Sequence, residues 1–392
     1  MLLIMEKLKI FARTVEDEAR KQVMEMSCCD AYKESVVRIM PDVHAGMGCT
    51  IGTVIALGDK VVPNTVGVDI GCGMLVCYLG KIDIDFRMLD DVINNRVPSG
   101  FNIHDSAVMR YEPLLNLRCV NVIDYDMANR SIGSLGGGNH FIEIDEDDDG
   151  MKYLVIHSGS RNLGVRVCKY YQDMAVKRCS DNKADISAIV EQLKSEGRAN
   201  EIQRVLQSVK KPSFNKDLAY LDGNAMRDYI HDMEIAQEYA FMNRLTIRDI
   251  IIRAMGWYVD DSFTTIHNYI ETEKGILRKG AVRANQGERL IIPMNMRDGS
   301  LICVGKGNED WLCSAPHGAG RLMSRKRAKE TLSMEDFKAT MDGVYSTSVC
   351  METIDESPMA YKPMEEIQEC IKDTCDVVKV IRPVYNFKAK GN

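Results

Sequence analysis

The 392-residue sequence lacks the features that would assign it quickly to several common classes of protein. No window holds the ~18 consecutive apolar residues that a membrane-spanning helix requires. Glu6, Lys7 and Lys9 interrupt the N-terminus where a signal peptide needs an apolar run. Internal repeats and low-complexity tracts are missing as well. We therefore expect a soluble, cytoplasmic protein that makes no contact with membranes.

Familiar metal and nucleotide motifs are also missing. The 13 cysteines include no C-x-x-C pair, which argues against a zinc ribbon or a thioredoxin-like motif. An odd number of irregularly spaced cysteines is typical of free thiols in a reducing compartment. Neither G-x-x-x-x-G-K-[ST] nor G-x-G-x-x-G after a strand is present. A nucleotide would therefore need an uncommon type of binding site.

The sequence also has no excess of positive charge. The net charge is −7, which argues against a protein that coats nucleic acid with its whole surface. One basic run, RLMSRKRAKE, stands out at residues 321–330. A solvated helix face is one interpretation of such a run. A phosphate-binding patch is the other, because the run directly follows a histidine in a glycine-rich motif.

Predicted strands lie at both ends of the sequence, with a mainly helical segment between them at about 165–256. The segments 140–144 and 153–159 predict a hairpin across the acidic turn DEDDDG. This order predicts an α+β fold, in which the two strand-rich ends form one body and the helical segment packs around it. The predicted strands are 36–40, 53–57, 74–79, 140–144, 153–159, 263–271, 276–282, 289–296, 300–306 and 377–387.

The sequence has only seven histidines, and four of them stand at informative positions. His140 follows a glycine triplet, His157 ends a predicted strand, His267 lies within another, and His317 stands in CSAPHGAGR. We assign ordinary structural roles to the other three, because no physical argument gives them a function. They are His44, His104 and His231.

The motif VGVDIGCGM places a carboxylate and a thiolate three residues apart, at Asp69 and Cys72. Glycines on both sides leave the approach to a tight turn uncrowded. Together with imidazoles, these groups suit a divalent transition metal such as Mn, Fe, Co or Zn. The alternative is that Cys72 is a small buried residue in a turn. Spacing alone leaves both interpretations open.

Small residues surround His317 on both sides, which indicates that something must approach it closely. The glycine-rich turns GGGNH, HSGSR and HGAGR could also hold phosphates through their backbone N–H groups. Two of these turns have an arginine close behind the histidine, at Arg161 and Arg321.

These motifs together resemble one family, the RtcB-type RNA-splicing ligases, which depend on GTP and manganese. The resemblance runs from MPDVHAGMGCTIG through VGVDIGCGM, SLGGGNHFIEI, HSGSR, IHNYIE, RKGAV and HGAGR to SPMAYK and RPVYNFKA. It implies a single ligase domain over residues 1–392, built as one compact body of mixed β-sheets. Peripheral helices and a deep metal-containing cleft complete that fold.

The resemblance also implies the site residues. Two Mn²⁺ ions would be held by Asp69, Cys72, His140, His157 and His267, with Cys72 as the bridging thiolate, and His317 would carry GMP covalently. The implied nucleotide-binding residues are Asn139, Phe141, Glu143, Asn268, Asn295, Ser300, Gly318, Ala319, Gly320, Tyr361 and Lys388. Our candidates for binding RNA phosphates are Arg161, Arg321, Arg325 and Arg327.

The implied reaction joins an RNA 3′-phosphate or 2′,3′-cyclic phosphate end to a 5′-hydroxyl end. The sequence departs from the family at IIPMNM, where Met294 and Asn295 replace the usual Gly-Ser. One alternative function is a metal-dependent phosphoesterase that opens cyclic phosphates without ligating. Such an enzyme would lack the HGAG motif, which is intact here. The other alternative, a non-catalytic RNA-binding paralogue, predicts a damaged metal or nucleophile position.

Overall fold

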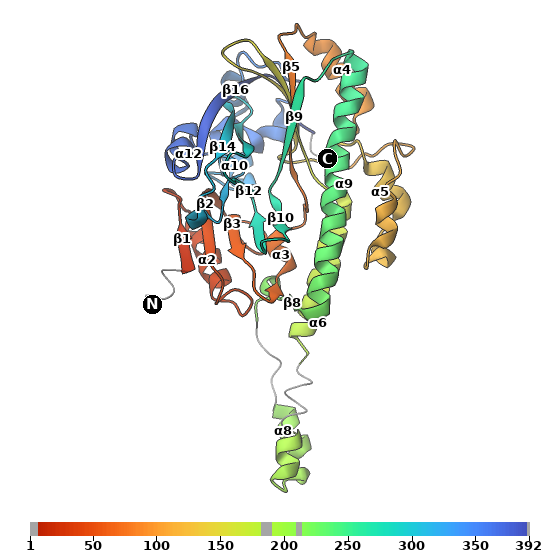
Figure 1. The fold of residues 1–392 in the computed structure, drawn as a ribbon, viewed down its shortest axis with the longest axis vertical. Coiled ribbons are helices and arrows are strands. Elements are labelled where there is room, and N and C mark those ends of the chain that lie inside the picture. Colours follow the sequence, from red (N-terminus) through yellow and green to blue (C-terminus); the bar gives the residue numbers. More distant parts are fainter. Residues whose placement is uncertain (1–6, 182–189, 209–213, 390–392) are drawn as a thin grey trace.

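Two β-sheets form the centre of the molecule in the computed structural model, which describes residues 7–181, 190–208 and 214–389 (Figure 1). The larger sheet has seven strands in the order β13-β14-β16-β6-β7-β5-β9, all antiparallel. Its edge strands β9 and β13 also contact each other, so the sheet curls towards a barrel. The strands are β5 (Gly73–Gly80), β6 (Phe141–Glu146), β7 (Lys152–Ser158), β9 (Asp261–Ile266), β13 (Arg289–Asn295), β14 (Gly299–Gly305) and β16 (Cys375–Phe387).

The smaller sheet has five strands in the order β1-β2-β3-β11-β10. It is mixed, because β1 runs parallel to β2 while the other neighbours are antiparallel. Its strands are β1 (Leu8–Ile10), β2 (Val37–His44), β3 (Ile51–Ala56), β10 (Asn268–Glu271) and β11 (Ile276–Lys279). Two short ladders pair β12 (Ala281–Arg283) with β15 (Ser314–Pro316) and β4 (Lys60–Val61) with β8 (Leu221–Asp222).

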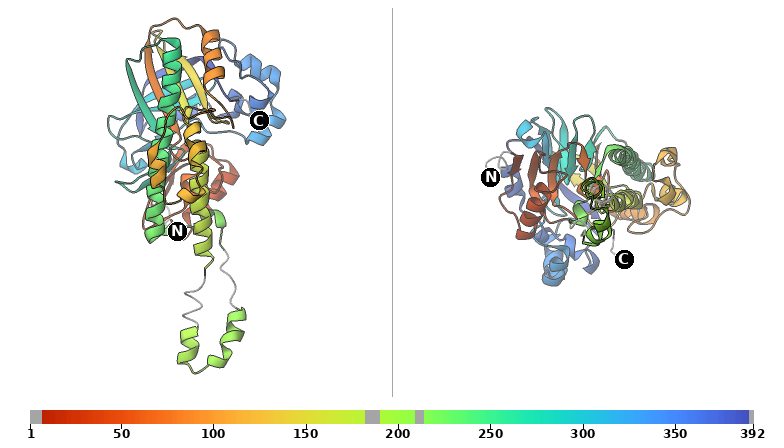
Figure 2. Two further views of the ribbon diagram at one scale, coloured as in Figure 1. Left: turned by 90° about the vertical axis from the view of Figure 1, so that its right-hand side faces the viewer. Right: turned by 90° about the horizontal axis from the view of Figure 1, so that it is seen from below.

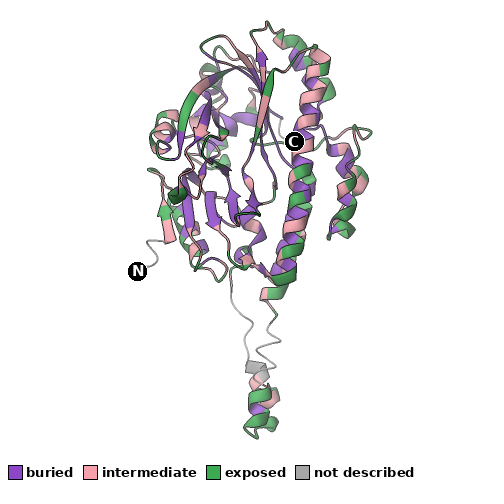
Figure 3. Cartoon of the chain, viewed as in Figure 1, coloured by how far each residue is buried: buried purple, intermediate pink, exposed green. Residues whose placement is uncertain are grey.

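Helices cover the outside of this body. The longest, α9 (Gly223–Met255), runs along its length beside α6 (Arg161–Cys179) (Figures 1 and 2). The inner side of α9 is buried and its outer side exposed (Figure 3). The other helices are α2 (Asp17–Ser27), α3 (Pro63–Val66), α4 (Phe86–Arg96), α5 (Tyr125–Ser131), α8 (Ile202–Ser208), α10 (Arg325–Thr331), α11 (Met334–Thr340) and α12 (Met364–Cys370).

The α+β prediction is confirmed, and most predicted strands match observed ones. The hairpin across DEDDDG is β6–β7, which pairs Glu146 with Lys152. In the helical segment, parts of the predicted region at 182–189 and 209–213 lie outside the described residues. Within the described part of the chain, no helix has the length and apolarity of a membrane span. All 13 cysteines are free thiols, as expected.

Two strand predictions are wrong, because each of these predicted strands is interrupted at one residue. The predicted strand 263–271 is divided at His267 into β9 and β10, which belong to different sheets. The predicted strand 276–282 is likewise divided at Gly280, whose φ of +62° does not continue a strand. The two breaks face each other, because Gly280 donates its backbone N–H to the carbonyl of His267 (2.6 Å). The chain therefore changes sheet beside the most informative histidine of this region.

Candidate active site

The structure brings together all five metal ligands implied by the sequence. Asp69 and Cys72 stand in the turn before β5, and His140 directly precedes β6. His157 lies near the end of β7, and His267 occupies the break between β9 and β10. Adjacent antiparallel strands thus present these groups at one end of the larger sheet.

Distances divide the cluster into two groups that share one thiolate. Cys72 Sγ lies 3.2 Å from Nε2 of both His140 and His157. His140 Nε2 lies 2.8 Å from Asp69 Oδ2, and His157 Nε2 lies 3.3 Å from His267 Nε2. In each group, Asp69–Cys72–His140 and Cys72–His157–His267, the ligand atoms lie within 4.8 Å of one another. This geometry fits a metal site in which both groups use the Cys72 sulfur.

The chemistry of the donors also fits a divalent transition metal such as manganese. Burial lowers the pKa of His157 and His267 well below the usual histidine value, so both rings are neutral and able to bind metal. Burial also raises the pKa of the Cys72 thiol. A cation must therefore displace a proton when it binds to this sulfur.

Glycines are required near the cluster because a larger side chain would collide with the ligands. A Cβ atom at Gly136 would lie 1.9 Å from His140 Nδ1, and one at Gly159 would lie 1.9 Å from Asp69 Oδ1. Neither side chain could keep its position beside a larger residue. The glycine-rich turns GGGNH and HSGSR therefore make room for metal ligands.

Two polar residues of α9 hold the turns that carry the ligands. Asn243 and Arg244 are both fully buried. The Arg244 guanidinium donates to the carbonyls of Gly71 (2.9 Å) and Ser158 (2.8 Å), which are the neighbours of Cys72 and His157. The Asn243 amide donates to Gly159 O (3.1 Å) and accepts from Gly133 N (2.8 Å). Such supporting bonds orient metal ligands in advance.

His317 lies beside this cluster, with its ring centroid 4.7 Å from that of His267. Its partner is Asp42 in β2, whose Oδ2 is 2.6 Å from His317 Nδ1 and accepts the His317 backbone N–H at 3.1 Å. The Asp42 side chain is fully buried and its other oxygen has no partner among the described residues. With Nδ1 donating to this carboxylate, the lone pair of the neutral ring lies on Nε2. Nε2 is therefore the ring atom with an available lone pair.

Close packing explains part of the small-residue pattern around His317. A Cβ at Gly320, which has a φ of +75°, would lie 2.3 Å from the carbonyl oxygen of Asp42. The clearance at Gly320 therefore serves the close approach of β2. At Gly318 a Cβ would meet only Pro293 O, at 3.3 Å.

A cavity of about 510 Å³ opens in front of His317. Most of the predicted nucleotide-binding residues line it, together with His44 and Glu356. They are Asn139, Phe141, Glu143, Asn295, Gly318, Ala319, Gly320, Tyr361 and Lys388. The neighbouring His157 of the metal cluster also faces this cavity, so the cavity and the cluster form one continuous site.

Two predicted nucleotide residues are not among the lining residues. Asn268 supports the metal turn instead, since it donates to Asp69 O (3.1 Å) and accepts from Gly280 N (3.0 Å). Ser300 is fully buried, and its Oγ has no partner among the described residues. Asn295 lines the cavity, but its amide oxygen caps the β13–β14 turn by accepting from Arg297 N (3.0 Å).

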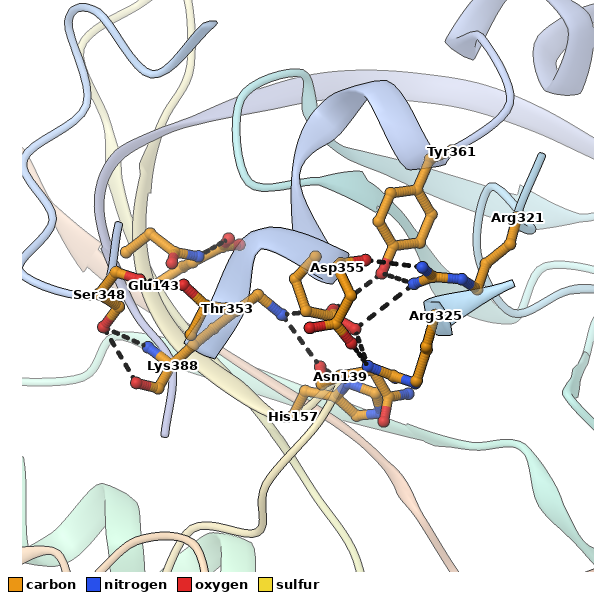
Figure 4. A network of polar contacts seen from close by, with 12 residues as sticks. Asn139, Glu143, His157, Arg321, Arg325, Ser348, Thr353, Asp355, Tyr361 and Lys388 are labelled. Atoms are coloured by element: carbon orange, nitrogen blue, oxygen red, sulfur yellow. Dashed lines mark hydrogen bonds and ion pairs between the residues drawn. The ribbon is translucent and has the colours of Figure 1, made fainter. Parts of the chain in front are cut away.

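Glu356 connects three cavity residues, Tyr361, Lys388 and Arg325, which are labelled in Figure 4. Its Oε2 accepts from Tyr361 OH (2.8 Å) and Lys388 Nζ (3.0 Å), and its Oε1 accepts from Arg325 (2.5 Å). Although burial alone would raise the pKa of this carboxyl, the surrounding cations lower it, with Lys388 contributing most. Glu356 is therefore ionised, and both of its carboxylate oxygens accept hydrogen bonds from residues that line the cavity.

The four predicted RNA-binding arginines occupy different environments. Arg161 is half-buried and donates to Gly100 O, Asn102 O and Ser134 Oγ. Arg321 donates to Asp355 O (2.6 Å), and Arg325 pairs with Asp355 (2.7 Å) and Glu356. Arg327 is exposed on α10. The side chains on this wall are thus partly neutralised by carboxylates.

Sequence reasoning missed Asp42, Glu356 and Arg244. Asp42 stands in a motif that carried the family resemblance, MPDVHAGMGCTIG, and Glu356 directly precedes another, SPMAYK. Asp42 and its partner His317 are 275 residues apart. The only local signal for Arg244 was a charged residue within the buried stripe of a long helix.

Comparisons with known proteins agree with this site. A family model described as tRNA-splicing ligase RtcB matches residues 22–120 and 113–389. The chain is 31% identical to the RNA-splicing ligase RtcB of Escherichia coli (strain K12), covering 95% of both chains. It is 26% identical to the tRNA-splicing ligase RtcB of Archaeoglobus fulgidus, covering 85% of this chain and 83% of that one. The chain belongs to the RtcB family of RNA-splicing ligases.

Proposed function

We propose that this protein is a GTP- and manganese-dependent RNA ligase that joins a 3′-phosphate or 2′,3′-cyclic phosphate end to a 5′-hydroxyl end. Family membership supports the joining of RNA. One observation carries the finer proposal: the Asp42-bound His317 lies between the metal cluster and the cavity. A nucleophile in that place can reach a phosphate held by both.

In the first step, His317 Nε2 attacks the α-phosphorus of GTP. The N–P bond forms as the bond to the β-phosphate oxygen breaks, and pyrophosphate leaves. Asp42 keeps the proton on Nδ1 and stabilises positive charge on the ring. Among the described residues, no other acidic side chain hydrogen-bonds to this imidazole.

In the second step, an oxygen of the RNA 3′-phosphate attacks the phosphorus on His317 and takes GMP from it. In the third, the 5′-hydroxyl attacks the activated 3′-phosphorus, loses its proton to water and displaces GMP. A cyclic phosphate end would first be hydrolysed at the same site. Arg161, Arg321, Arg325 and Arg327 remain our candidates for contacts with RNA phosphates.

Asp69, Cys72, His140, His157 and His267 would hold the two manganese ions, which when bound supply positive charge that offsets the charge of the reacting phosphates. The supporting bonds from Asn243 and Arg244 keep these ligands in place without the ion. The cavity residues Asn139, Phe141, Glu143, Tyr361 and Lys388 would bind the guanosine part of GTP.

The test uses purified protein, manganese, α-labelled GTP and RNA pairs with defined ends. We expect label on the protein with GTP alone, and joined RNA only when a 3′-phosphate or cyclic phosphate meets a 5′-hydroxyl. A phosphoesterase would open the cyclic end without labelling the protein. A non-catalytic paralogue would do neither.

A further inference from the structure

A loop with no assigned role lies beside the glycine-rich turn that leads into the cavity. Ser99 forms a β-bridge with Leu135, whose backbone N–H donates to Pro98 O (2.8 Å). Further along, a Cβ at Gly137 would lie 4.0 Å from the Cα of Gly100. Residues 98–102 therefore run alongside residues 134–137, only a few positions before Asn139 and the metal ligand that follows it.

Phe101 stands at the tip of this loop with its side chain in solvent. At 84% exposure it is the most exposed of the large hydrophobic residues that the structure describes. The loop beneath it is nevertheless fastened, because Arg161 donates to the carbonyls on both sides of Phe101, at Gly100 (2.7 Å) and Asn102 (3.3 Å). Arg161 itself has a φ of +53°, an unfavourable conformation for a residue with a side chain. Backbone strain of this kind persists at functional sites.

The surface next to Phe101 is bare backbone bordered by an arginine. Residues 137–139 are exposed, although the chain on either side of them is buried. A Cβ at Gly138, which has a φ of +71°, would lie 3.5 Å from Nη2 of Arg325. Arg325 uses its Nη1 for Asp355 and Glu356, which leaves Nη2 on the side of this backbone. Asn139 also lines the cavity, so this surface continues into it.

We propose that this strip, defined as Phe101, residues 137–139 and Arg325, binds the unpaired nucleotides next to a reacting RNA end. A base stacks on the Phe101 ring, and the adjoining phosphate lies over the glycine backbone beside Arg325. Aromatic rings that alternate with positive charge bind single strands without sequence preference, and bare backbone N–H groups donate hydrogen bonds to phosphate oxygens. This inference rests on the proposed function and adds the place where the strand enters.

A mutant series with abasic RNA tests the strip. Phe101→Ala should raise the KM for RNA in ligation by about tenfold, the loss expected for one stacked base. Phe101→Trp should restore parental values. Labelling of the protein by α-labelled GTP should stay unchanged in every variant. Tyr258→Ala is the matched control, because Tyr258 is 78% exposed but lies outside the strip, and it should behave as the parent.

Substrates that lack one base near the 3′-phosphate or the 5′-hydroxyl end distinguish a loss of base stacking from a folding defect of the variant. The effect of Phe101→Ala should disappear for the substrate whose missing base is the one that stacks. The proposal is overturned if Phe101→Ala matches the parent with intact RNA, or if it weakens every abasic substrate equally. If the parent protein joins no RNA ends, the proposed function is wrong, and this proposal is wrong with it.

Discussion

One oxygen of Asp42, Oδ2, lies 2.6 Å from Nδ1 of His317 and 3.1 Å from the backbone nitrogen of the same residue. These two contacts fix both the rotation of the imidazole ring and the position of its proton. The ring of His267 lies against it, with the two centroids 4.7 Å apart. The His317 ring is thus oriented by the smaller sheet, which contains Asp42, while the neighbouring cluster of candidate metal ligands belongs mainly to the larger sheet.

Asp42→Asn should slow formation of the GMP adduct by about 100-fold or more, because an amide can place the wrong tautomer on His317. The rate of labelling by α-labelled GTP in a single turnover measures this effect. Metal content and the ligation of RNA that already carries a 3′-guanylate should change little. Unchanged labelling would show that the carboxylate does not orient the nucleophile.

His317→Ala should abolish the covalent adduct while leaving bound metal in place, since no metal ligand is altered. The variant should still join RNA with a 3′-guanylate end to a 5′-hydroxyl end, because that step needs no transfer through His317. If α-labelled GTP still marked the variant chain, another residue would be the nucleophile.

Cys72→Ala should remove bound manganese, because Cys72 belongs to both groups of ligands. Since burial raises the pKa of the Cys72 thiol and metal binding releases its proton, manganese affinity in the parent should fall as the pH is lowered. Metal per chain after dialysis measures both effects. Cys77→Ala is the matched control, because Cys77 is equally buried on the next strand but belongs to neither group.

The clustering of the five ligands was predictable from the family resemblance, whereas local spacing alone left a structural role for Cys72 open. Gly136, four residues before His140, provides a clearance that the sequence displays directly, but the clearance at Asp69 comes from Gly159, which is distant in sequence. The sheet change at His267 was not predictable, because its apolar neighbours continue the strand pattern on both sides. The hydrogen bonds at that break come from distant segments: Gly280 donates its N–H to the carbonyl of His267, and His267 donates its N–H to the carbonyl of Cys72.

Asp42 and Glu356 show a second limit of the sequence. Each acts through partners brought close by the fold, and a carboxylate near proline and valine or serine and proline has no distinctive spacing of its own. The charges of the basic run after His317 can be read directly from the sequence. The carboxylates that pair with Arg325 could not be predicted, because they come from a separate segment.

Glu143→Gln should reduce the preference for GTP over ATP. A carboxylate accepts from the N1–H and N2 amine of guanine, a pair of donors that adenine does not present, and leaving it unpaired costs at least roughly tenfold in affinity. Burial raises the pKa of Glu143 to about 7. Below that pH the carboxyl gains a proton and loses acceptor capacity, so the ratio of labelling by GTP to labelling by ATP should fall as the pH drops through about 7. An unchanged ratio would exclude Glu143 as the guanine contact.

Glu356→Gln should raise the KM for GTP in adduct formation by about tenfold, with a smaller change in the maximal rate. The carboxylate holds Tyr361 and Lys388 at the cavity wall, and an amide can accept only one of these donors at full strength. Asp355→Asn is the matched control, because it removes a charge paired with Arg325 without touching Tyr361 or Lys388. If Glu356 positions the nucleotide residues, only Glu356→Gln changes the KM. If both variants change it equally, the effect comes through Arg325 alone, and the positioning role of Glu356 is wrong.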